Sequence, residues 1–281
     1  MIKVNGIEIK QDKFPDETLL MKFNPAAEEY ENIGNNAPIL VEWLYENDGE
    51  LFALICVKGQ IDRYFHSRSI VLEMPYIPHA RMDRVKNYDD VFTLKYFCNT
   101  INSLNFNRVV VRDAHSNVSL ALLDNVVEED IYNYVHKAIV ASKAEALYFP
   151  DEGAMKRYKN IADEKKMPYS FGIKDRDWAT GELKGTIVMN KEAIVGKDVL
   201  IIDDICSKGG TFFYAAKALK AAGAKSVSLY VTHCEKTIIL GVMASTDDLV
   251  DHVYTTKSIF PEELFNEGYD PYWKEWITVF H

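Results

Sequence analysis

The stretch Val199-Leu-Ile-Ile-Asp-Asp-Ile-Cys-Ser-Lys-Gly-Gly-Thr211 decides what kind of fold this chain has. Four apolar residues at its start are typical of a buried parallel strand, and the glycines near its end indicate a tight turn. Residues Phe212–Ala222 are rich in Ala, Leu and Lys and end before Gly223, which predicts a helix. A strand, a small-residue loop and a helix amino terminus form a ready anion site, because free backbone N–H groups and the helix dipole converge there.

Two adjacent carboxylates, Asp203 and Asp204, stand beside this anion site. Carboxylates in that position can hold a ribose diol or a cation close to a phosphate, so the pattern favours a phosphorylated sugar as ligand. The alternative is an ordinary βαβ crossover with an aspartate as a cap, since Asp and Gly are common in such loops. The stretch is not a P-loop, because no Gly-Lys-Ser/Thr follows the glycines, and it is not a GxGxxG dinucleotide fingerprint.

Composition and charge restrict the class of protein. The chain has 281 residues, of which 48% are hydrophobic and 26% charged, enough for two α/β domains with their own cores. A net charge of −10 argues against a nucleic-acid surface and against an anionic membrane as partner. The amino terminus does not resemble a signal peptide, and the four cysteines are scattered without a CxxC pair. We therefore expect reduced thiols and a cytoplasmic protein.

Strands alternate with helices along the whole chain, which predicts the α/β class and parallel sheets. The pattern restarts near Glu128–Ile131, so we expect one domain over residues 1–130, a second over 131–260, and a tail, 261–281, that packs back on the first. The expected strands are Leu19–Phe23, Leu51–Val57, Ser69–Met74, Arg108–Val111, Ala146–Phe149, Tyr169–Ile173, Val199–Ile202, Ser226–Val231, His252–Thr255 and one within Trp273–His281. The expected helices are Val91–Asn102, Ile131–Ser142, Ala154–Lys165 and Phe212–Ala222, with a further short element at Leu120–Leu123.

Polar residues 174–197 lack a clear period, and a long loop inside a compact domain is usually functional. Because this segment leaves directly from the end of a strand, we interpret it as a lid. It opens with Lys174-Asp-Arg176, whose cations can neutralise the charge that develops on transferred phosphoryl oxygens.

Three further motifs follow predicted strands, where α/β proteins bind ligands. Pro75-Tyr-Ile-Pro-His-Ala-Arg-Met-Asp-Arg84 places two arginines and an aspartate in one loop, and an arginine fork suits phosphate oxygens. Val109-Val-Val-Arg-Asp-Ala-His-Ser116 ends in an Asp-x-His, and Phe149-Pro-Asp-Glu-Gly-Ala-Met-Lys-Arg157 puts Asp151 before a helix. Taken singly, these are also compatible with a solvated loop, a hydrogen-bonded structural histidine and a helix cap.

Together, these motifs resemble those of the ribose-phosphate diphosphokinases (PRPP synthetases), which share a fold with the type I phosphoribosyltransferases. Lys13-Phe-Pro-Asp-Glu17 and Thr232-His233 resemble two more motifs of that family, and six motifs occur in the family's order between positions 13 and 234. The resemblance implies two phosphoribosyltransferase-like domains, each a mostly parallel sheet flanked by helices. It separates the diphosphokinases from the phosphoribosyltransferases, which lack the constellation of Arg81, His115, Lys174 and Arg176.

The resemblance also implies roles for individual residues, with Mg²⁺ as cofactor and ATP as co-substrate. Lys174, Arg176 and His115 are then catalytic, and His115 and Asp151 serve the metal, although imidazole is an unusual Mg²⁺ ligand. Phe14, Asp16 and Glu17 help to enclose the adenine bound by a neighbouring subunit, which implies a homo-oligomer, from dimer to hexamer. The residues implied to bind ATP are Phe14, Asp16, Glu17, Arg81 and Asp83.

The acceptor is implied to lie at the 203–211 stretch, where Asp203 and Asp204 hold the ribose diol and residues Ser207, Lys208, Gly209, Gly210 and Thr211 hold the 5-phosphate. The family's loop normally reads Asp-Thr-x-Gly-Thr, so Ser207-Lys208 exchanges a negative for a positive charge. This change favours a more anionic acceptor. Ribose 5-phosphate and ADP-ribose both stay open, the second as in phage pathways that rebuild NAD, in which case the protein acts in the host cytoplasm. A catalytically silent regulatory subunit and a phosphoribosyltransferase are the further alternatives.

Overall fold

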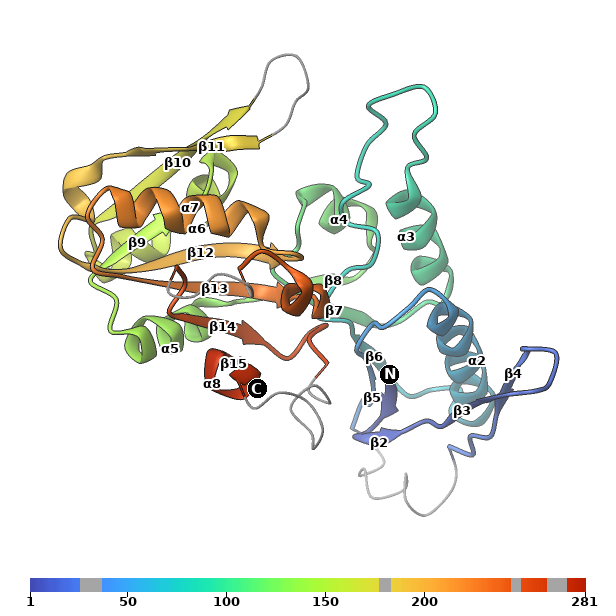
Figure 1. Cartoon of the computed structure of the whole chain (residues 1–281). Coiled ribbons are helices and arrows are strands. Elements are labelled where there is room, and N and C mark those ends of the chain that lie inside the picture. Colours follow the sequence, from blue (N-terminus) through green and yellow to red (C-terminus); the bar gives the residue numbers. More distant parts are fainter. Residues whose placement is uncertain (26–36, 177–182, 244–248, 262–271) are drawn as a thin grey trace. The chain divides into compact units, whose positions relative to one another are not determined.

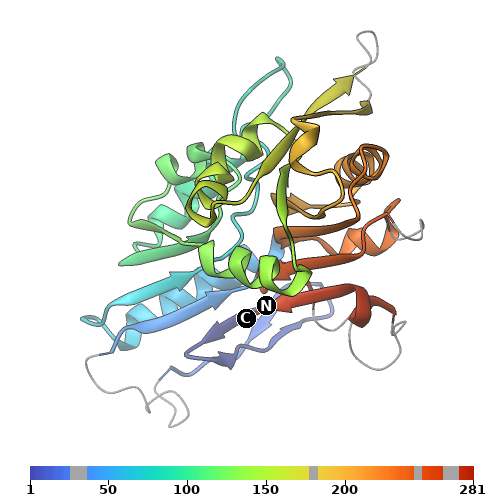
Figure 2. The ribbon, with the colours of Figure 1, turned by 90° about the vertical axis from the view of Figure 1, so that its left-hand side faces the viewer.

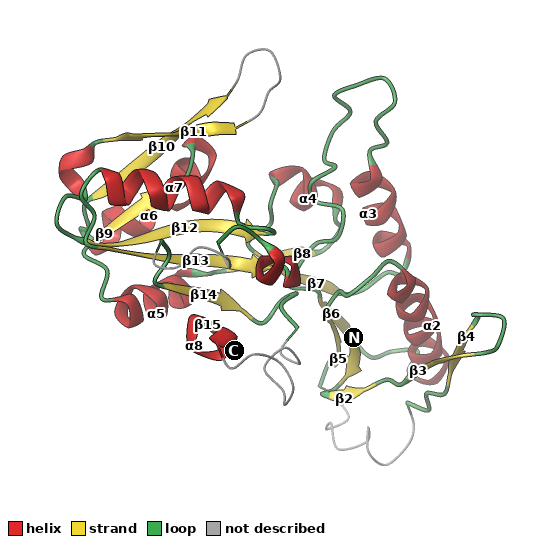
Figure 3. Cartoon of the chain, viewed as in Figure 1, coloured by secondary structure: helices red, strands yellow, loops and turns green. Residues whose placement is uncertain are grey.

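A computed structural model describes the chain except for residues 26–36, 177–182, 244–248 and 262–271 (Figure 1). It divides into two compact units, Met1–Asp130 and Ile131–His281. Each unit is built around its own sheet, and from residue 39 onward strands mostly alternate with helices (Figure 3). Within the described ranges, no helix is both long enough and apolar enough to cross a membrane.

The first unit contains a six-stranded sheet in the order β2-β1-β5-β6-β7-β8. Its last four strands are parallel, whereas β1 is antiparallel to both β2 and β5. A separate antiparallel pair, β3 and β4, follows β2 along the chain. The bounds are β1 Ile2–Val4, β2 Ile7–Glu8, β3 Gln11–Lys13, β4 Leu19–Met21, β5 Ile39–Trp43, α2 Gly49–Tyr64, β6 Ile70–Glu73, α3 Thr93–Ser103, β7 Arg108–Arg112, α4 Asn117–Leu122 and β8 Val126–Glu129.

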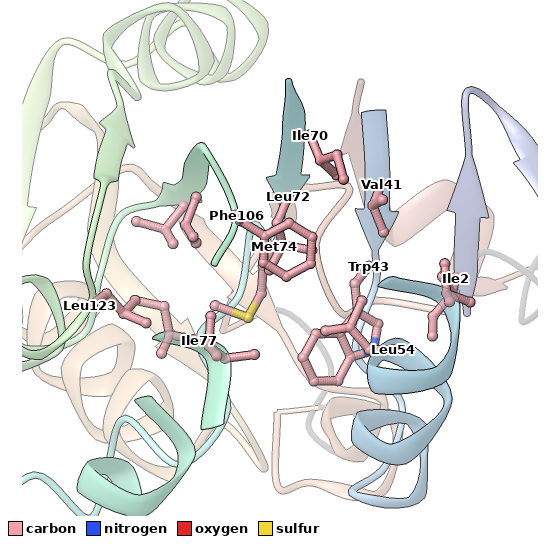
Figure 4. Packing of buried hydrophobic residues seen from close by; sticks show 14 of the residues in the cluster. Ile2, Val41, Trp43, Leu54, Ile70, Leu72, Met74, Ile77, Phe106 and Leu123 are labelled. Atoms are coloured by element: carbon pink, nitrogen blue, oxygen red, sulfur yellow. The ribbon is translucent and has the colours of Figure 1, made fainter. Parts of the chain in front are cut away.

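The core of this unit lies between the sheet and its helices. Alternate residues of β5 and β6, among them Val41, Trp43 and Leu72, are buried and pack with Leu54 of α2 (Figure 4). The strand expected at Leu51–Val57 is wrong, because these residues belong to α2. Within α2 the buried positions recur every three or four residues, the spacing of one helix face, and a short apolar window cannot distinguish this from a strand.

The second unit contains a seven-stranded sheet in the order β11-β10-β9-β12-β13-β14-β15. All neighbouring pairs are parallel except β10 with β11. The bounds are α5 Tyr132–Ser142, β9 Ala146–Phe149, α6 Glu152–Lys165, β10 Tyr169–Arg176, β11 Leu183–Met189, η1 Lys191–Ala193, β12 Asp198–Cys206, α7 Gly210–Ala221, β13 Ser226–Cys234, η2 Lys236–Leu240, β14 His252–Thr256, α8 Tyr272–Trp276 and β15 Ile277–Phe280.

Alternation along β12 assigns each helix to one face of this sheet. Val199 and Ile201 pack in one cluster with the buried residues of α7, whereas Leu200 and Ile202 pack in another with those of α5 and α6. A strand covered on both faces must be apolar at consecutive positions, which is why 199–202 reads as an unbroken apolar run. The α/β class and the mostly parallel sheets predicted from the sequence are confirmed.

One expectation about the second unit needs correction. Much of the polar segment 174–197 is not a loop, because β10 continues to Arg176 and pairs with β11, with Ile173 opposite Ile187. In the tail, β15 pairs in parallel with β14 as an edge strand of the second sheet (red in Figure 2), so it belongs to the second unit, and the expected packing of the tail on the first domain stays a prediction. The strand expected within Trp273–His281 therefore exists, as β15.

Candidate active site

Two of the predicted ligand-binding carboxylates lie near the carboxyl end of β12, on opposite faces of the sheet by strand alternation. Asp204 is buried, with 6% of its surface exposed, and its Oδ2 accepts a hydrogen bond from Nη1 of Arg157 at 3.1 Å. Arg157 comes from α6, the helix on that face. Asp203 is half-buried, and its Oδ1 accepts from the backbone N–H of Asp204 at 3.0 Å. The positive charge of Arg157 therefore offsets the negative charge of Asp204.

A third carboxylate, Asp151, follows β9, the strand beside β12. It is the N-cap of α6 and accepts from the backbone N–H of Ala154 at 2.9 Å, so the helix-cap interpretation is correct whatever else Asp151 does. Burial, then the charge of Asp204 and also that of Asp151, raise the pKa of Asp203 well above its usual range. The three carboxylates therefore act on one another, and this end of the sheet carries negative charge that a cation would offset.

This charge fits Mg²⁺, which prefers oxygen ligands and keeps several waters. Among the described residues, no three His, Cys, Asp or Glu side chains are placed to hold a metal ion by themselves. A Mg²⁺ ion here would accordingly rely on one or two carboxylates together with substrate oxygens, which is its usual arrangement with phosphates. His115 belongs to the first unit and Asp151 to the second, so their joint service of a metal stays a prediction.

The loop between β12 and α7, residues 207–209, has the form of an anion site. Gly209 adopts a left-handed conformation with φ of 76° and leads into α7, which begins at Gly210 and includes Thr211 in its first turn. The N-cap residue of α7 is Gly209, which has no side chain to cap the helix, so the amide groups of the first turn suit a ligand. Ser207 is half-buried and Lys208 is exposed. These features suit an anion bound by backbone amides and one lysine.

In the first unit, Asp83 connects two of the predicted motifs. Its carboxylate accepts from Nε and Nη2 of Arg84 at 2.6 and 2.7 Å and from Oγ of Ser116 at 2.7 Å. The side-chain hydrogen bond from Arg84, followed by that from Ser116, lowers the pKa of Asp83 to about 2. Ser116 in turn is the N-cap of α4, directly after His115. Asp83 therefore ties the loop of Arg81 and Arg84 to the end of β7, and a direct contact with ATP stays a prediction.

The backbone is strained at both of these motifs. Asp113, at the end of β7 and buried, has φ of 43°, and His79 has φ of 64°. A residue with a side chain rarely adopts such angles, and where it does the surrounding contacts must hold it. The ring of His79 lies 3.1 Å from Oδ1 of Asp48 and 5.6 Å from the ring centre of Phe97. His115 is half-buried beside Asp113, and Arg81 is exposed.

The predicted adenine-enclosing residues form the tip of the hairpin between β3 and β4. The backbone N–H of Phe14 donates to the carbonyl of Thr18 at 2.9 Å, and Oδ1 of Asp16 accepts from the N–H and the hydroxyl of Thr18 at 3.1 and 2.6 Å. Glu17 pairs with Lys13 at 2.6 Å. These bonds hold the turn while 48% of Phe14 is exposed to solvent. An ordered turn that presents an aromatic ring is compatible with stacking on a base.

The remaining predicted residues are placed only in part. Lys174 and Arg176 lie at the end of β10, with their backbones opposite Thr186 and Leu183, and their side chains lie outside the described part of the structure. Sequence reasoning missed the role of Arg157, although it stands in a quoted motif. Its distance of 47 residues from Asp204 left no local signal that the two would pair.

Comparison with known proteins agrees with this arrangement. The profile of the phosphoribosyl transferase domain matches residues 125–275, more than half of the chain. The chain belongs to this family. Its motifs had indicated the diphosphokinase branch, and the sequence relatives confirm that resemblance and the enzyme class it implies, a diphosphotransferase.

Ribose-phosphate pyrophosphokinase of Saccharolobus solfataricus is 29% identical over 191 residues, 67% of this chain and 65% of that protein. The enzyme of the same name from Pyrococcus furiosus is 29% identical over 266 residues, 90% of this chain and 89% of that protein. Phosphoribosylpyrophosphate synthetase from Mycobacterium smegmatis has a similar fold, with a TM-score of 0.73 over 97% of this chain and 85% of that one, at 18% identity.

Proposed function

We propose that this chain transfers the β,γ-diphosphate of Mg·ATP to the anomeric hydroxyl of a 5-phosphorylated ribose. The observation that carries the proposal is the end of β12, where paired carboxylates stand next to a loop and a helix terminus whose N-cap residue is a glycine. Carboxylates suit the ribose diol, and the amides of the loop suit the phosphate on the same sugar. Membership of the phosphoribosyl transferase family supports this assignment of the site.

In the proposed reaction, the anomeric oxygen attacks the β-phosphorus in line. The bond from that phosphorus to the oxygen that bridges it to the α-phosphorus breaks, AMP leaves with this oxygen, and the hydroxyl proton passes to solvent. No covalent enzyme intermediate is needed, so positioning and electrostatics determine the rate. Lys174 and Arg176 are proposed to stabilise the charge on the transferred group, and Arg81 and His115 to face ATP. Bound Mg²⁺ would neutralise phosphate charge, with Asp151, Asp203 and His115 as its candidate ligands.

A second acceptor, ADP-ribose, is favoured by one observation at the loop. Lys208 is exposed at a position where the resembling family has an uncharged residue, and Ser207 replaces an aspartate. The loop therefore carries more positive charge than the family's usual loop, which holds a terminal monophosphate. ADP-ribose carries a diphosphate on the same ribose carbon and would use the additional cation.

Assembly into a homo-oligomer is also proposed. The ordered turn at Phe14 exposes an aromatic ring, and the resemblance implies that this ring helps to enclose the adenine bound by a neighbouring subunit. Light scattering on the purified protein tests this, with Phe14→Ala as the variant. A fully active monomer would exclude the assembly as a condition of activity.

The central experiment offers ribose 5-phosphate and ADP-ribose in competition for limiting ATP and Mg²⁺, with the products read by mass spectrometry. We expect AMP to form when at least one acceptor is present and not when both are omitted. If AMP forms but neither acceptor gains a diphosphate, the proposed transfer is contradicted. If no AMP forms, the regulatory-subunit alternative is favoured. Consumption of PRPP with a nucleobase and without ATP would instead favour a phosphoribosyltransferase.

A further inference from the structure

The anion loop, residues 207–209, rests on a segment that follows β13, residues 235–243, which we name the buttress. The two meet where β12 and β13 end, with Cys206 opposite Cys234, and the backbone N–H of Glu235 donates to the carbonyl of Cys206 at 2.8 Å. The buttress then turns through η2 and reaches Met243, which is buried. Each of the three loop residues has a contact with it.

The contact at Ser207 is a chain of hydrogen bonds. Oγ1 of Thr237 donates to Oε2 of Glu235 at 3.2 Å, and Oγ of Ser207 lies 3.1 Å from the same Oγ1 of Thr237. A hydroxyl has one hydrogen, and an ionised carboxylate can only accept. Because the hydrogen of Thr237 goes to Glu235, the hydrogen between the two hydroxyls must come from Ser207. Ser207 is left with lone pairs alone for anything bound at the loop.

The contacts at Lys208 and Gly209 prevent the loop from rearranging around this chain. A Cβ at Gly241 would lie 2.0 Å from the carbonyl oxygen of Lys208, so two backbones pass at a distance that only glycine allows. The side chain of Met243 also packs over Gly209, with Cε 2.7 Å from the position of a Cβ there. Together with the bond from the N–H of Glu235 to the carbonyl of Cys206, these contacts restrain the backbone on both sides of Ser207.

We propose that Thr237 is a positioning residue that makes Ser207 a hydrogen-bond acceptor in the anion loop. Ser207 then takes a donor, a hydroxyl of the acceptor sugar, while phosphate oxygens are held by Lys208 and by backbone N–H groups. The identity of the sugar rests on the proposed function. An oxygen that offers only lone pairs repels an ionised phosphate oxygen, so the arrangement favours a ligand that brings a hydroxyl to Ser207 over one that brings an ionised oxygen there.

The test uses Thr237→Val, which keeps the shape of the side chain and removes the hydroxyl. Ser207 then regains a free hydrogen that can point at a phosphate oxygen. We expect inorganic phosphate, titrated calorimetrically into the full chain, to bind about three- to tenfold more tightly, the range of one ordinary hydrogen bond. Thr237→Ser should bind phosphate as the wild type does, and Ser207→Ala combined with Thr237→Val should lose the gain.

The sign of the change separates this role from a merely structural one, because damage to the loop weakens phosphate binding. Unchanged or weaker binding in a folded Thr237→Val protein overturns the proposal. Should that variant fail to fold, Thr237→Ala carries the same expectation. Phosphate binding needs no turnover, so a wild type that binds phosphate and forms no AMP contradicts the proposed function alone. A wild type that does not bind phosphate overturns the inference.

Discussion

Replacing Gly241 by alanine should impair the acceptor site while leaving the ATP side intact. The added Cβ would lie 2.0 Å from the carbonyl oxygen and 2.7 Å from the carbonyl carbon of Lys208, whereas ordinary contact begins at 3.4 Å. Because real Cβ atoms essentially never approach another atom closer than 3.0 Å, one of the two backbones must move by about 1 Å or more. A flexible side chain could yield at little cost, but these atoms belong to the main chain of the anion loop.

The loop has little freedom to absorb this displacement on the strand side, because β12 and β13 are paired up to Cys206 and Cys234. A misplacement of about 1 Å can lower a catalytic rate about 10²-fold. We expect the affinity for ribose 5-phosphate to fall about tenfold or more, with a loss of about 1–3 kcal/mol in the free energy of unfolding from overpacking. ATP should bind as it does to the wild type, since its implied contacts lie on other loops.

Calorimetric titration with each ligand separately measures both effects, and thermal unfolding measures the stability. Gly59→Ala is the matched control, because a Cβ at Gly59, within α2, would meet no atom within 4 Å. That control should bind both ligands normally and gain about 0.5–1 kcal/mol of stability from its better helix propensity. If folded Gly241→Ala binds ribose 5-phosphate with wild-type affinity, the buttress does not set the shape of the loop.

Four further predictions concern single side chains. Lys174→Ala and Arg176→Ala should each lower kcat about 10²-fold with little change in ATP affinity, and equal losses in rate and affinity would contradict a role in the transition state. Lys208→Thr should lower the ratio of ADP-ribose product to ribose 5-phosphate product by about 10- to 100-fold in the competition assay. An unchanged ratio would exclude Lys208 as the cause of a preference for ADP-ribose. Because the pKa of Asp203 is raised by burial and by neighbouring carboxylates, its ionisation opposes folding, so Asp203→Asn should raise Tm at neutral pH without Mg²⁺ and abolish acceptor binding. The pKa of Asp83 is lowered from 3.8 to about 2, so its contribution to stability is present above pH 3.8 and is lost as the pH falls toward 2, and Asp83→Asn should flatten the unfolding curve in that window.

The extent to which the fold could be predicted depends on how local its signals are. The β12–loop–α7 unit was legible because a strand covered on both faces must be apolar at every position, and because Gly209 is needed for a left-handed turn. The apolar run at Leu51–Val57 was ambiguous, since helix and strand share such runs over short windows. The pairing of β15 with β14 depends on a partner more than twenty residues away, which periodicity does not report.

The site shows the same division between local and distant signals. Motifs predicted which strand ends carry chemistry, because parallel strands bring their carboxyl ends to one edge of a sheet. They did not show that Arg157 pairs with Asp204, or that Thr237, 30 residues from Ser207, settles the direction of its hydrogen bond. A serine in place of an acid looks like the loss of an acceptor when the loop is considered alone. Because Ser207 gives its hydrogen to Thr237, it offers only lone pairs to a ligand, as the acid would. The loop has therefore changed its charge but still presents a hydrogen-bond acceptor at this position.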